Sequence, residues 1–293
     1  MVPTKQTESV GPGPGSASQR YSPRPLTDGE RWTAEVLGEL RRRHYRPRAW
    51  AAFVHSSFER SYRSRRARPR MAREARAWGA TGAVAWMAAC TAARGRGDLR
   101  PRPLPGLLWW FAVWQMLDWH LGMAEGGDGE PRERLSPADA ITLVRFWLVP
   151  AAFGTAHSSP GLPTVIVLGG LTDWLDGNIA LRHGRTRLGR DLDTTADLAF
   201  LTACAAAAHG AGRIPPAAFW VLTARHGLGL AVALGAVFAR ARQPAIRGRR
   251  WGGVLRLGGL AICTCGADRT GAALLIAGSL VPPRATALHL SPA

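Results

Sequence analysis

Eight apolar segments separated by charged connections constrain the fold of this chain more than any other feature. They cover residues 77–94, 104–124, 139–158, 161–181, 192–211, 215–239, 252–267 and 270–284. A helix that crosses a membrane needs about 20 apolar residues, and several of these segments are shorter. Because a helix satisfies its backbone hydrogen bonds internally, the sequence predicts an all-α, polytopic membrane bundle with eight spans, six to eight being allowed.

Arginine is distributed unevenly along this chain, whose formal net charge is +18. Residues 1–76 contain 17 Lys and Arg against 7 Asp and Glu. Nucleic-acid-binding proteins also carry such charge, but the chain has a single lysine and shows none of their sequence motifs. Positive-inside topology explains the charge more simply, so no nucleic-acid partner is expected.

The arginines between the later segments predict the orientation. Residues 182–190 contain four arginines and residues 240–250 contain five, whereas the connections that alternate with them hold only Arg213 and Arg269. The positive-inside rule therefore places residues 182–190 at the cytosolic face of a multi-pass cell-membrane protein. The connection 94–102 also has four arginines and disagrees. Either the segment 77–94 is re-entrant, or this short loop violates the rule because the larger N-terminal cluster of charge dominates.

Composition divides the chain into three predicted parts: a basic cytosolic arm (1–76), an extra N-terminal membrane hairpin with its linker (77–134) and a larger membrane domain (135–293). The first 28 residues are rich in Pro, Gly and Ser, which predicts disorder, and they lack the apolar run of a signal peptide. A short helix is expected from residue 28. For the arginine-rich stretch 46–76 two interpretations stay open: a surface helix on anionic lipid, or a solvated arm that only fixes topology.

Four aspartates lie at helical spacings in an otherwise apolar stretch. Asp173 and Asp176 are three residues apart and Asp193 and Asp197 four apart, so each pair shares one helix face. Four negative charges near a membrane are tolerable around cations, and carboxylate oxygens suit Mg2+ or Mn2+. The alternative is structural: acids at helix ends that pair with neighbouring arginines.

Glycines and arginines around the acids favour a phosphate ligand. Gly177 and Gly189 have no side chain, so helices and a nucleotide can approach the backbone closely. The connection between the two acidic pairs also carries residues that can hold phosphate oxygens by charge-assisted hydrogen bonds. These are Arg182, Arg185, Arg187 and Arg190.

Seven residues fit the pattern D-x-x-D-G-x-x-A-R followed by G-x-x-x-D-x-x-x-D: Asp173, Asp176, Gly177, Ala180, Gly189, Asp193 and Asp197. In this pattern the chain resembles the CDP-alcohol phosphotransferases, from about residue 135 to its end. The family core has six helices, so the resemblance implies a six-helix core preceded by an extra N-terminal hairpin.

The resemblance implies a transferase of phospholipid biosynthesis. It would move a phosphatidyl group from a CDP-linked donor, with CDP-diacylglycerol expected, to a small alcohol and release CMP. Two divalent cations, Mg2+ or Mn2+, are the implied cofactors. Asp173, Asp176 and Asp193 would hold them on the diphosphate, and Asp197 would complete the metal site and act as general base on the acceptor hydroxyl.

Further residues are expected to contact the donor. Leu181 stands where the family has Arg, and the spacer is one residue shorter, so Arg182 is the candidate replacement. Thr142 and Arg145 occupy positions where the first core helix of the family often has Thr and Arg; the alternative is a cap and a snorkelling arginine. The expected donor contacts are Gly177, Ala180, Arg182 and Gly189, with Thr142 and Arg145 added.

The acceptor is expected to be phosphorylated, such as glycerol 3-phosphate or inositol phosphate. Arg225 lies inside an apolar segment, where an arginine either binds an anion or pairs with an acid, and Arg247 of the connection 240–250 is its expected partner. Two other functions stay open: a prenyltransferase that binds a diphosphate through Asp-rich motifs, and a non-enzymatic membrane scaffold. A homodimer is considered as the assembly.

Overall fold

The computed structural model describes residues 27–126, 129–184, 186–239, 246–247, 250–282 and 284–285. Most of the segment predicted to be disordered, residues 1–26, lies outside the described residues. The described part is helical apart from two short strands, which confirms the predicted all-α bundle. Its α-helices are α1 (Asp28–Arg42), α2 (Pro47–Ala67), α3 (Pro69–Ala92), α4 (Pro103–His120), α5 (Pro137–Gly154), α6 (Gly161–His183), α7 (Arg187–Gly210), α8 (Pro216–Leu234), α9 (Arg250–Thr264) and α10 (Asp268–Leu280). Short elements are η1 (Leu121–Met123), η2 (Gly235–Ala239) and the antiparallel pair β1 (Ile246–Arg247) and β2 (Arg284–Ala285).

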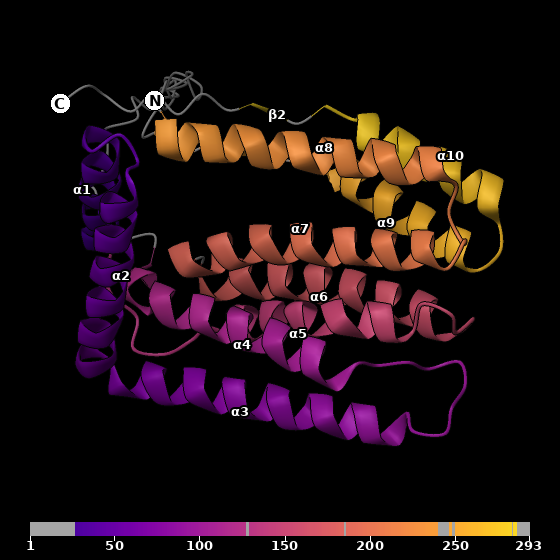
Figure 1. Cartoon of the computed structure of the whole chain (residues 1–293), viewed down its shortest axis with the longest axis horizontal. Helices are drawn as coiled ribbons and strands as arrows, with labels where there is room; N and C mark the ends of the chain where they lie inside the picture. Colours follow the sequence, from indigo (N-terminus) through magenta and orange to yellow (C-terminus); the bar gives the residue numbers. More distant parts are fainter. Residues whose placement is uncertain are drawn as a thin grey trace, which may run out of the picture.

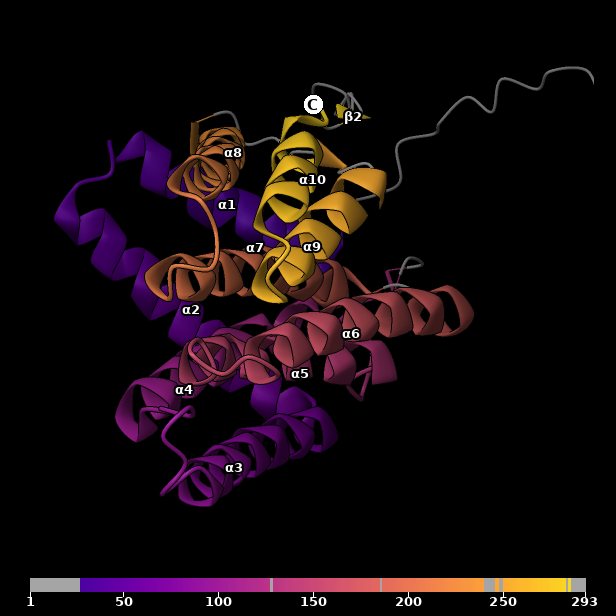
Figure 2. The same cartoon turned by 90° about the vertical axis from the view of Figure 1, so that its right-hand side faces the viewer.

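The helices form a bundle that is closed at one end by the basic arm. Each of the eight apolar segments coincides with one helix, from α3 to α10. Figure 1 shows α3 to α8 running side by side along the bundle, while α1 and α2 run across one end of it. The end view in Figure 2 places α9 and α10 together beside α7 and α8. The part of the arm that forms α1 and α2 is therefore a structured part of the molecule.

Among the described helices, one segment is long and apolar enough to cross a membrane by its length and composition. It is Pro216–Phe238, with a mean hydropathy of 1.6. The helices α9 and α10, of 15 and 13 residues, are shorter than the about 20 residues of a perpendicular span. The helices α6 and α7 carry the four aspartates. The predicted span count of six to eight stays a prediction.

In the predicted hairpin, which corresponds to α3 and α4, tryptophan rings of one helix pack against glycines of the other. The Trp110 ring of α4 fills the space beside Gly82 of α3, and the Trp86 ring fills the space beside Gly106, so that a Cβ on either glycine would clash. The indole of Trp110 donates a 2.8 Å hydrogen bond to the carbonyl oxygen of Gly79. The missing side chain of glycine lets each ring approach the neighbouring helix closely. The indole N–H can then reach a backbone carbonyl as hydrogen-bond acceptor.

The hairpin shares a hydrophobic core with the helices that follow it. Trp110, Val113 and Leu117 of α4 cluster with Phe146 of α5 and Leu192 of α7. Two indole hydrogen bonds cross the same boundary, from Trp109 to Phe146 O at 2.8 Å and from Trp147 to Gly82 O at 3.0 Å. The helices α3, α4, α5 and α7 are therefore packed around one shared hydrophobic core.

The arm is attached to the start of α7. Thr27 and Glu30 form a capping box that fixes the start of α1. Glu30 also pairs with Arg187, the first residue of α7, at 3.4 Å. The backbone N–H of Arg187 donates to Glu125 O at 3.1 Å, and the side chain of Glu125 accepts from Gly29 N at 3.2 Å. The first turn of α1 and the first turn of α7 therefore hold each other in place.

Candidate active site

The short connection between α6 and α7 brings the acids of the two helices together. Gly184 ends α6 with a φ of 81°, a left-handed conformation that glycine adopts without strain. Thr186 then caps α7, its hydroxyl accepting a hydrogen bond from Gly189 N at 2.9 Å. Asp193 follows within two turns of this fixed helix start.

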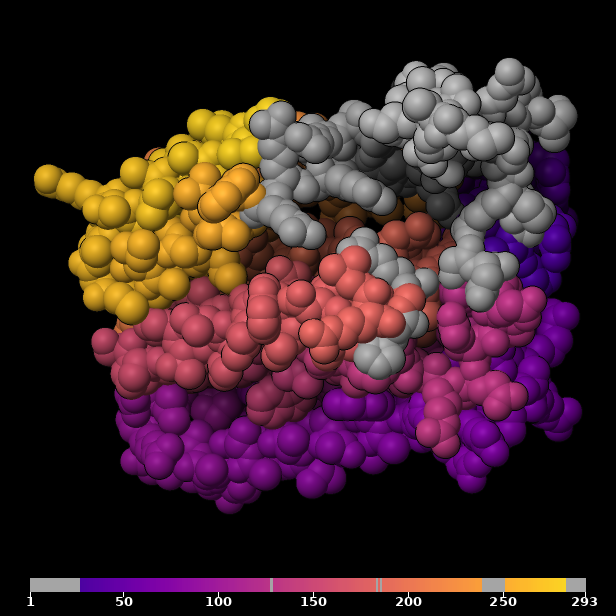
Figure 3. All heavy atoms as spheres, turned by 180° about the vertical axis from the view of Figure 1, so that it is seen from behind, coloured from indigo at the N-terminus to yellow at the C-terminus, as the bar shows by residue number. Residues whose placement is uncertain are grey.

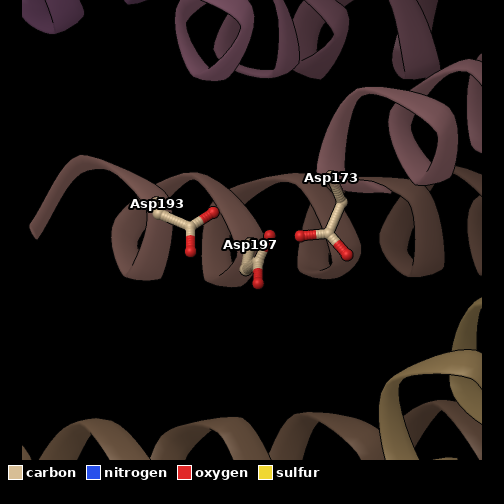
Figure 4. A group of neighbouring side chains, drawn as sticks. All are labelled: Asp173, Asp193 and Asp197. Atoms are coloured by element: carbon tan, nitrogen blue, oxygen red, sulfur yellow. The ribbon is translucent and has the colours of Figure 1, made fainter. Parts of the chain in front are cut away.

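Three of the four aspartates form a compact group. One carboxylate oxygen from each of Asp173, Asp193 and Asp197 lies within 4.8 Å of the other two. Figure 4 shows Asp193 and Asp197 projecting from successive turns of α7, while Asp173 reaches toward them from α6. Their side chains remain 57%, 45% and 54% exposed for Asp173, Asp193 and Asp197, respectively. Carboxylates this close together and this accessible can be ligands of a hard divalent cation.

A buried arginine lies at the centre of the acids. Arg145 of α5 has 1% of its side chain exposed and pairs with all four aspartates. Its nitrogens are 2.5 Å from Asp176 Oδ2 and 2.9 Å from Asp193 Oδ1. They are 3.4 Å from Asp173 Oδ1 and also bond the carboxylate of Asp197. The sequence interpretation placed Arg145 against the donor; in this structure its partners are the acids, whose charge it offsets.

Asp176 differs from the other three acids because it is buried. Its Oδ2 accepts hydrogen bonds from Thr142 Oγ1 at 2.9 Å and from Arg145 at 2.5 Å. Thr142 and Arg145 lie one turn apart on α5, whose start is fixed by a capping box between Ser136 and Asp139. The predicted pair on α5 therefore faces the site, where it anchors the one acid that solvent does not reach.

The chemistry of this group of side chains fits a divalent cation. Its ligand atoms are all carboxylate oxygens, the type that Mg2+ and Mn2+ prefer. Four carboxylates and one guanidinium carry a formal net charge of about minus three, so a positive ion is attracted even though Arg145 is present. The three exposed acids supply the open face at which such an ion would be held.

An open cavity of about 100 Å³ lies beside the acids. Its wall includes Gly177, Ala180 and Gly189, the small residues expected to contact the donor, together with Thr142. A Cβ atom on Gly177 would meet nothing within 4 Å, whereas one on Gly189 would lie 2.5 Å from Asp139 Oδ1. Gly177 therefore faces open space, and Gly189 allows α7 to pack closely on α5.

The four arginines between the acidic pairs do not act as one group. Arg190 lines the cavity. Arg187 is turned toward the arm, where it pairs with Glu30. Arg182 is exposed near the end of α6 and is not among the residues that line the cavity, and Arg185 lies outside the described residues. Of the predicted phosphate ligands, the structure brings Arg190 to the cavity.

Two arginines lie on the side of the acids that faces α8 and α9. Figure 3 shows a hollow above α6 on this face of the molecule, reaching toward the deeper helices. Arg256 of α9 lies within electrostatic range of Asp197 and of Arg225 on α8, and its Nε is buried without a hydrogen-bond partner among the described residues. His226, next to Arg225, forms a 3.0 Å hydrogen bond with Thr202.

Arg256 was not recognised in the sequence, although a signal was present. It lies inside the apolar segment 252–267, the same circumstance that singled out Arg225. The sequence interpretation chose Arg247 as the partner of Arg225. Arg247 belongs to β1, and its side chain lies outside the described part of the structure. Arg256 is the arginine that the structure places near Arg225.

Comparison with known proteins gives a match to a family model. A sequence model described as CDP-alcohol phosphatidyltransferase matches residues 135–283, slightly more than half of the chain. The matched region begins just before α5, ends after α10 and contains all four aspartates. The searches of curated proteins and of solved structures find no match.

Proposed function

Because the chain belongs to the CDP-alcohol phosphatidyltransferase family, and so is a transferase of substituted phosphate groups, we propose that it transfers the phosphatidyl group of CDP-diacylglycerol to a phosphorylated alcohol. The observation that carries this proposal is the convergence of the four acids of α6 and α7 beside an open cavity. Family membership also sets aside the prenyltransferase and the non-enzymatic scaffold as explanations of these acids.

The four acids have different roles in the proposed reaction. Asp173, Asp193 and Asp197 would hold the divalent cations at their exposed oxygens, with Asp176 as the buried fourth member fixed by α5. When bound, two such cations neutralise the diphosphate and polarise the phosphorus under attack. Arg145 keeps the four carboxylates oriented toward a common centre, so the ligands do not have to be gathered during the reaction.

The proposed transfer balances as a displacement at phosphorus. The hydroxyl oxygen of the acceptor forms a bond to the phosphorus of the phosphatidyl group, the bond from that phosphorus to the bridging oxygen breaks, and CMP leaves. Asp197 accepts the hydroxyl proton as general base. The nucleotide would lie in the cavity, against the wall formed by Gly177, Ala180 and Gly189 and with Arg190 near its phosphates.

The position of the site at the arm end of the bundle supports this chemistry. The family is membrane-associated, and a site near the helix ends lets lipid tails stay in the bilayer while CMP leaves to water. By the positive-inside rule this end, with the arm and the α6–α7 connection, faces the cytosol of a cell membrane. The direct test is to incubate purified protein in lipid with CDP-diacylglycerol, Mg2+ or Mn2+ and a panel of alcohols, and to identify the lipid product by mass.

Gly177→Ala tests the place of the nucleotide. The added methyl group has open space in the protein, so we expect unchanged or slightly higher stability, since Ala favours a helix by about 1 kcal/mol. If the donor lies against Gly177, kcat/KM for CDP-diacylglycerol falls roughly 10- to 100-fold because the donor is displaced. Gly229→Ala in α8, where a Cβ also meets nothing within 4 Å, is the matched control. Equal activity of the two variants would contradict the proposed place.

Arg225→Gln and Arg256→Gln test the choice of acceptor. A charge-assisted hydrogen bond to phosphate contributes about 1.5–3 kcal/mol, so kcat/KM with glycerol 3-phosphate should fall roughly 10- to 100-fold in either variant. With glycerol, which has no phosphate, the change should be small. Arg213→Gln at the opposite end of the bundle, where Arg213 donates to Thr264 O at 3.0 Å, is the control. An equal loss with both acceptors would contradict a phosphate-binding role.

A further inference from the structure

The helix α2 carries an exposed aromatic and apolar stripe that neither the fold nor the proposed reaction uses. Its members are spaced by four residues, which places them along one side of the helix. They are Trp50, Val54, Phe58 and Tyr62, and they are 39%, 39%, 46% and 50% exposed, respectively. The neighbouring side of α2 is buried and includes Ala49, Ser57 and Ser61, the last of which donates a hydrogen bond to Asp118 of α4. The stripe therefore borders the bundle without being covered by it.

Two ring contacts place the stripe level with the ends of the bundle helices. The Phe58 ring packs edge-on against Trp119 in the last turn of α4, with ring centroids 5.1 Å apart. The Trp50 ring lies 5.8 Å from Phe238 of η2, which follows α8. These contacts lie at the same end as the α6–α7 connection (Figure 1). The stripe thus contacts one aromatic ring at the end of α4 and one in η2.

Positive charge surrounds the stripe. The helix α2 contains five arginines and one acid. Arg48, Arg63 and Arg66 are exposed, and the guanidinium of Arg66 lies 4.6 Å from the centre of the Tyr62 ring. Aromatic side chains beside arginines on a helix that runs across the membrane-spanning direction are typical of helices that lie at a lipid surface.

We propose that α2 lies in the headgroup layer of an anionic leaflet, with the stripe in contact with acyl chains and its arginines in contact with lipid phosphates. Charge complementarity selects the partner, because α2 and the rest of the arm are strongly basic and anionic lipids attract such segments. The helix is too rich in arginine to cross the bilayer, and its place at the bundle end puts the stripe at the depth where lipid headgroups lie.

The test measures the depth of single spin labels in the full-length protein. Phe58→Cys places a label on the stripe, and Glu59→Cys places one on the adjacent residue, which points away from it and is 54% exposed. Cys265 is the exposed native cysteine, so both variants are made on Cys265→Ser. The labelled proteins are reconstituted in bilayers of phosphatidylcholine, with or without phosphatidylglycerol. Collision rates with oxygen and with a water-soluble nickel chelate report the depth of each label.

In bilayers that contain phosphatidylglycerol, the label at position 58 should collide several-fold more with oxygen, relative to the chelate, than the label at position 59. Equal ratios at the two positions would show a solvated arm and overturn the proposal. Exclusion of both reagents at position 58 would show a protein partner, such as a second copy, and would also overturn it. Val54→Cys repeats the measurement on the stripe if Phe58→Cys lowers the yield of folded protein.

The lipid charge is tested by removing arginines that flank the stripe. In Arg63→Gln/Arg66→Gln, the difference between the labels in phosphatidylglycerol bilayers should shrink toward the value in pure phosphatidylcholine. Neither arginine belongs to the active site, so phosphatidyl transfer measured in detergent should not change. The label at position 58 could instead show the same ratio of oxygen to chelate collisions in both bilayers and in both proteins. That result would overturn the assignment of anionic lipid as the partner.

Discussion

Asp197→Asn is expected to lower metal-dependent CMP release by about 100- to 10,000-fold, the range for loss of a positioned general base. The asparagine keeps the size of the side chain but cannot accept the acceptor proton, and it weakens the group formed with Asp173 and Asp193. The initial rate of CMP release from CDP-diacylglycerol at saturating Mn2+ measures the effect. Asp193→Asn should show a comparable loss, because Asp193 belongs to the same group of carboxylates.

Asp191→Asn is the matched control for this loss. Asp191 lies on the same helix, two residues from Asp193, and pairs at 3.8 Å with Arg187 and at 3.6 Å with Arg190. Such partly exposed pairs contribute about 0–1 kcal/mol, so activity should stay within a few-fold of wild type. Wild-type activity in Asp197→Asn, or equal losses in Asp191→Asn and Asp197→Asn, would refute the proposed active site.

Arg145→Gln is expected to destabilise the metal-free protein by about 3 kcal/mol. This lies at the low end of the range for removing one partner of a buried ion pair, because three of the four remaining carboxylates are about half exposed to solvent. The buried Asp176 keeps its hydrogen bond from Thr142 but loses its cation. Thermal unfolding in detergent with a chelator present measures the loss.

Added Mn2+ should raise the unfolding temperature of Arg145→Gln by more than that of wild type. A ligand at about 100 times its dissociation constant stabilises the folded state by about 2.7 kcal/mol, and the variant binds the ion without competition from a guanidinium. Arg190→Gln, which alters an exposed arginine of the same region, is the control and should change stability by about 0.5 kcal/mol or less. Unchanged stability of metal-free Arg145→Gln would contradict the role of Arg145 as counter-ion.

Much of the architecture follows from periodicity and spacing. Each apolar segment forms a helix. Apolar side chains offer the backbone no hydrogen-bond partners, and a helix satisfies the backbone N–H and C=O groups within the segment itself. The acids Asp173, Asp193 and Asp197 converge because helical spacing fixes which face they share and the connection is too short to separate α6 from α7. The small residues of the family pattern line the cavity for the same reason.

The partners of the charged residues were harder to predict. Spacing placed Thr142 and Arg145 on one face of α5, but which acids they meet depends on how α5 packs against α6 and α7. Arg187 belongs by sequence to a phosphate-binding connection, yet the fold of the arm gives it Glu30 as a partner. Such pairings join residues far apart in the chain, and local pattern contains no information about them.

The tryptophan contacts of α3 to α5 join the predicted hairpin to the region that follows it. The family match begins at residue 135, but the indoles of Trp109 and Trp147 form hydrogen bonds across that boundary, and Trp110 packs on the same core as Phe146. A chain cut at residue 135 would leave the face of α5 around Phe146 without its cover. We therefore expect the cooperative unit to be larger than the family region, with the hairpin as part of the scaffold that holds the acids.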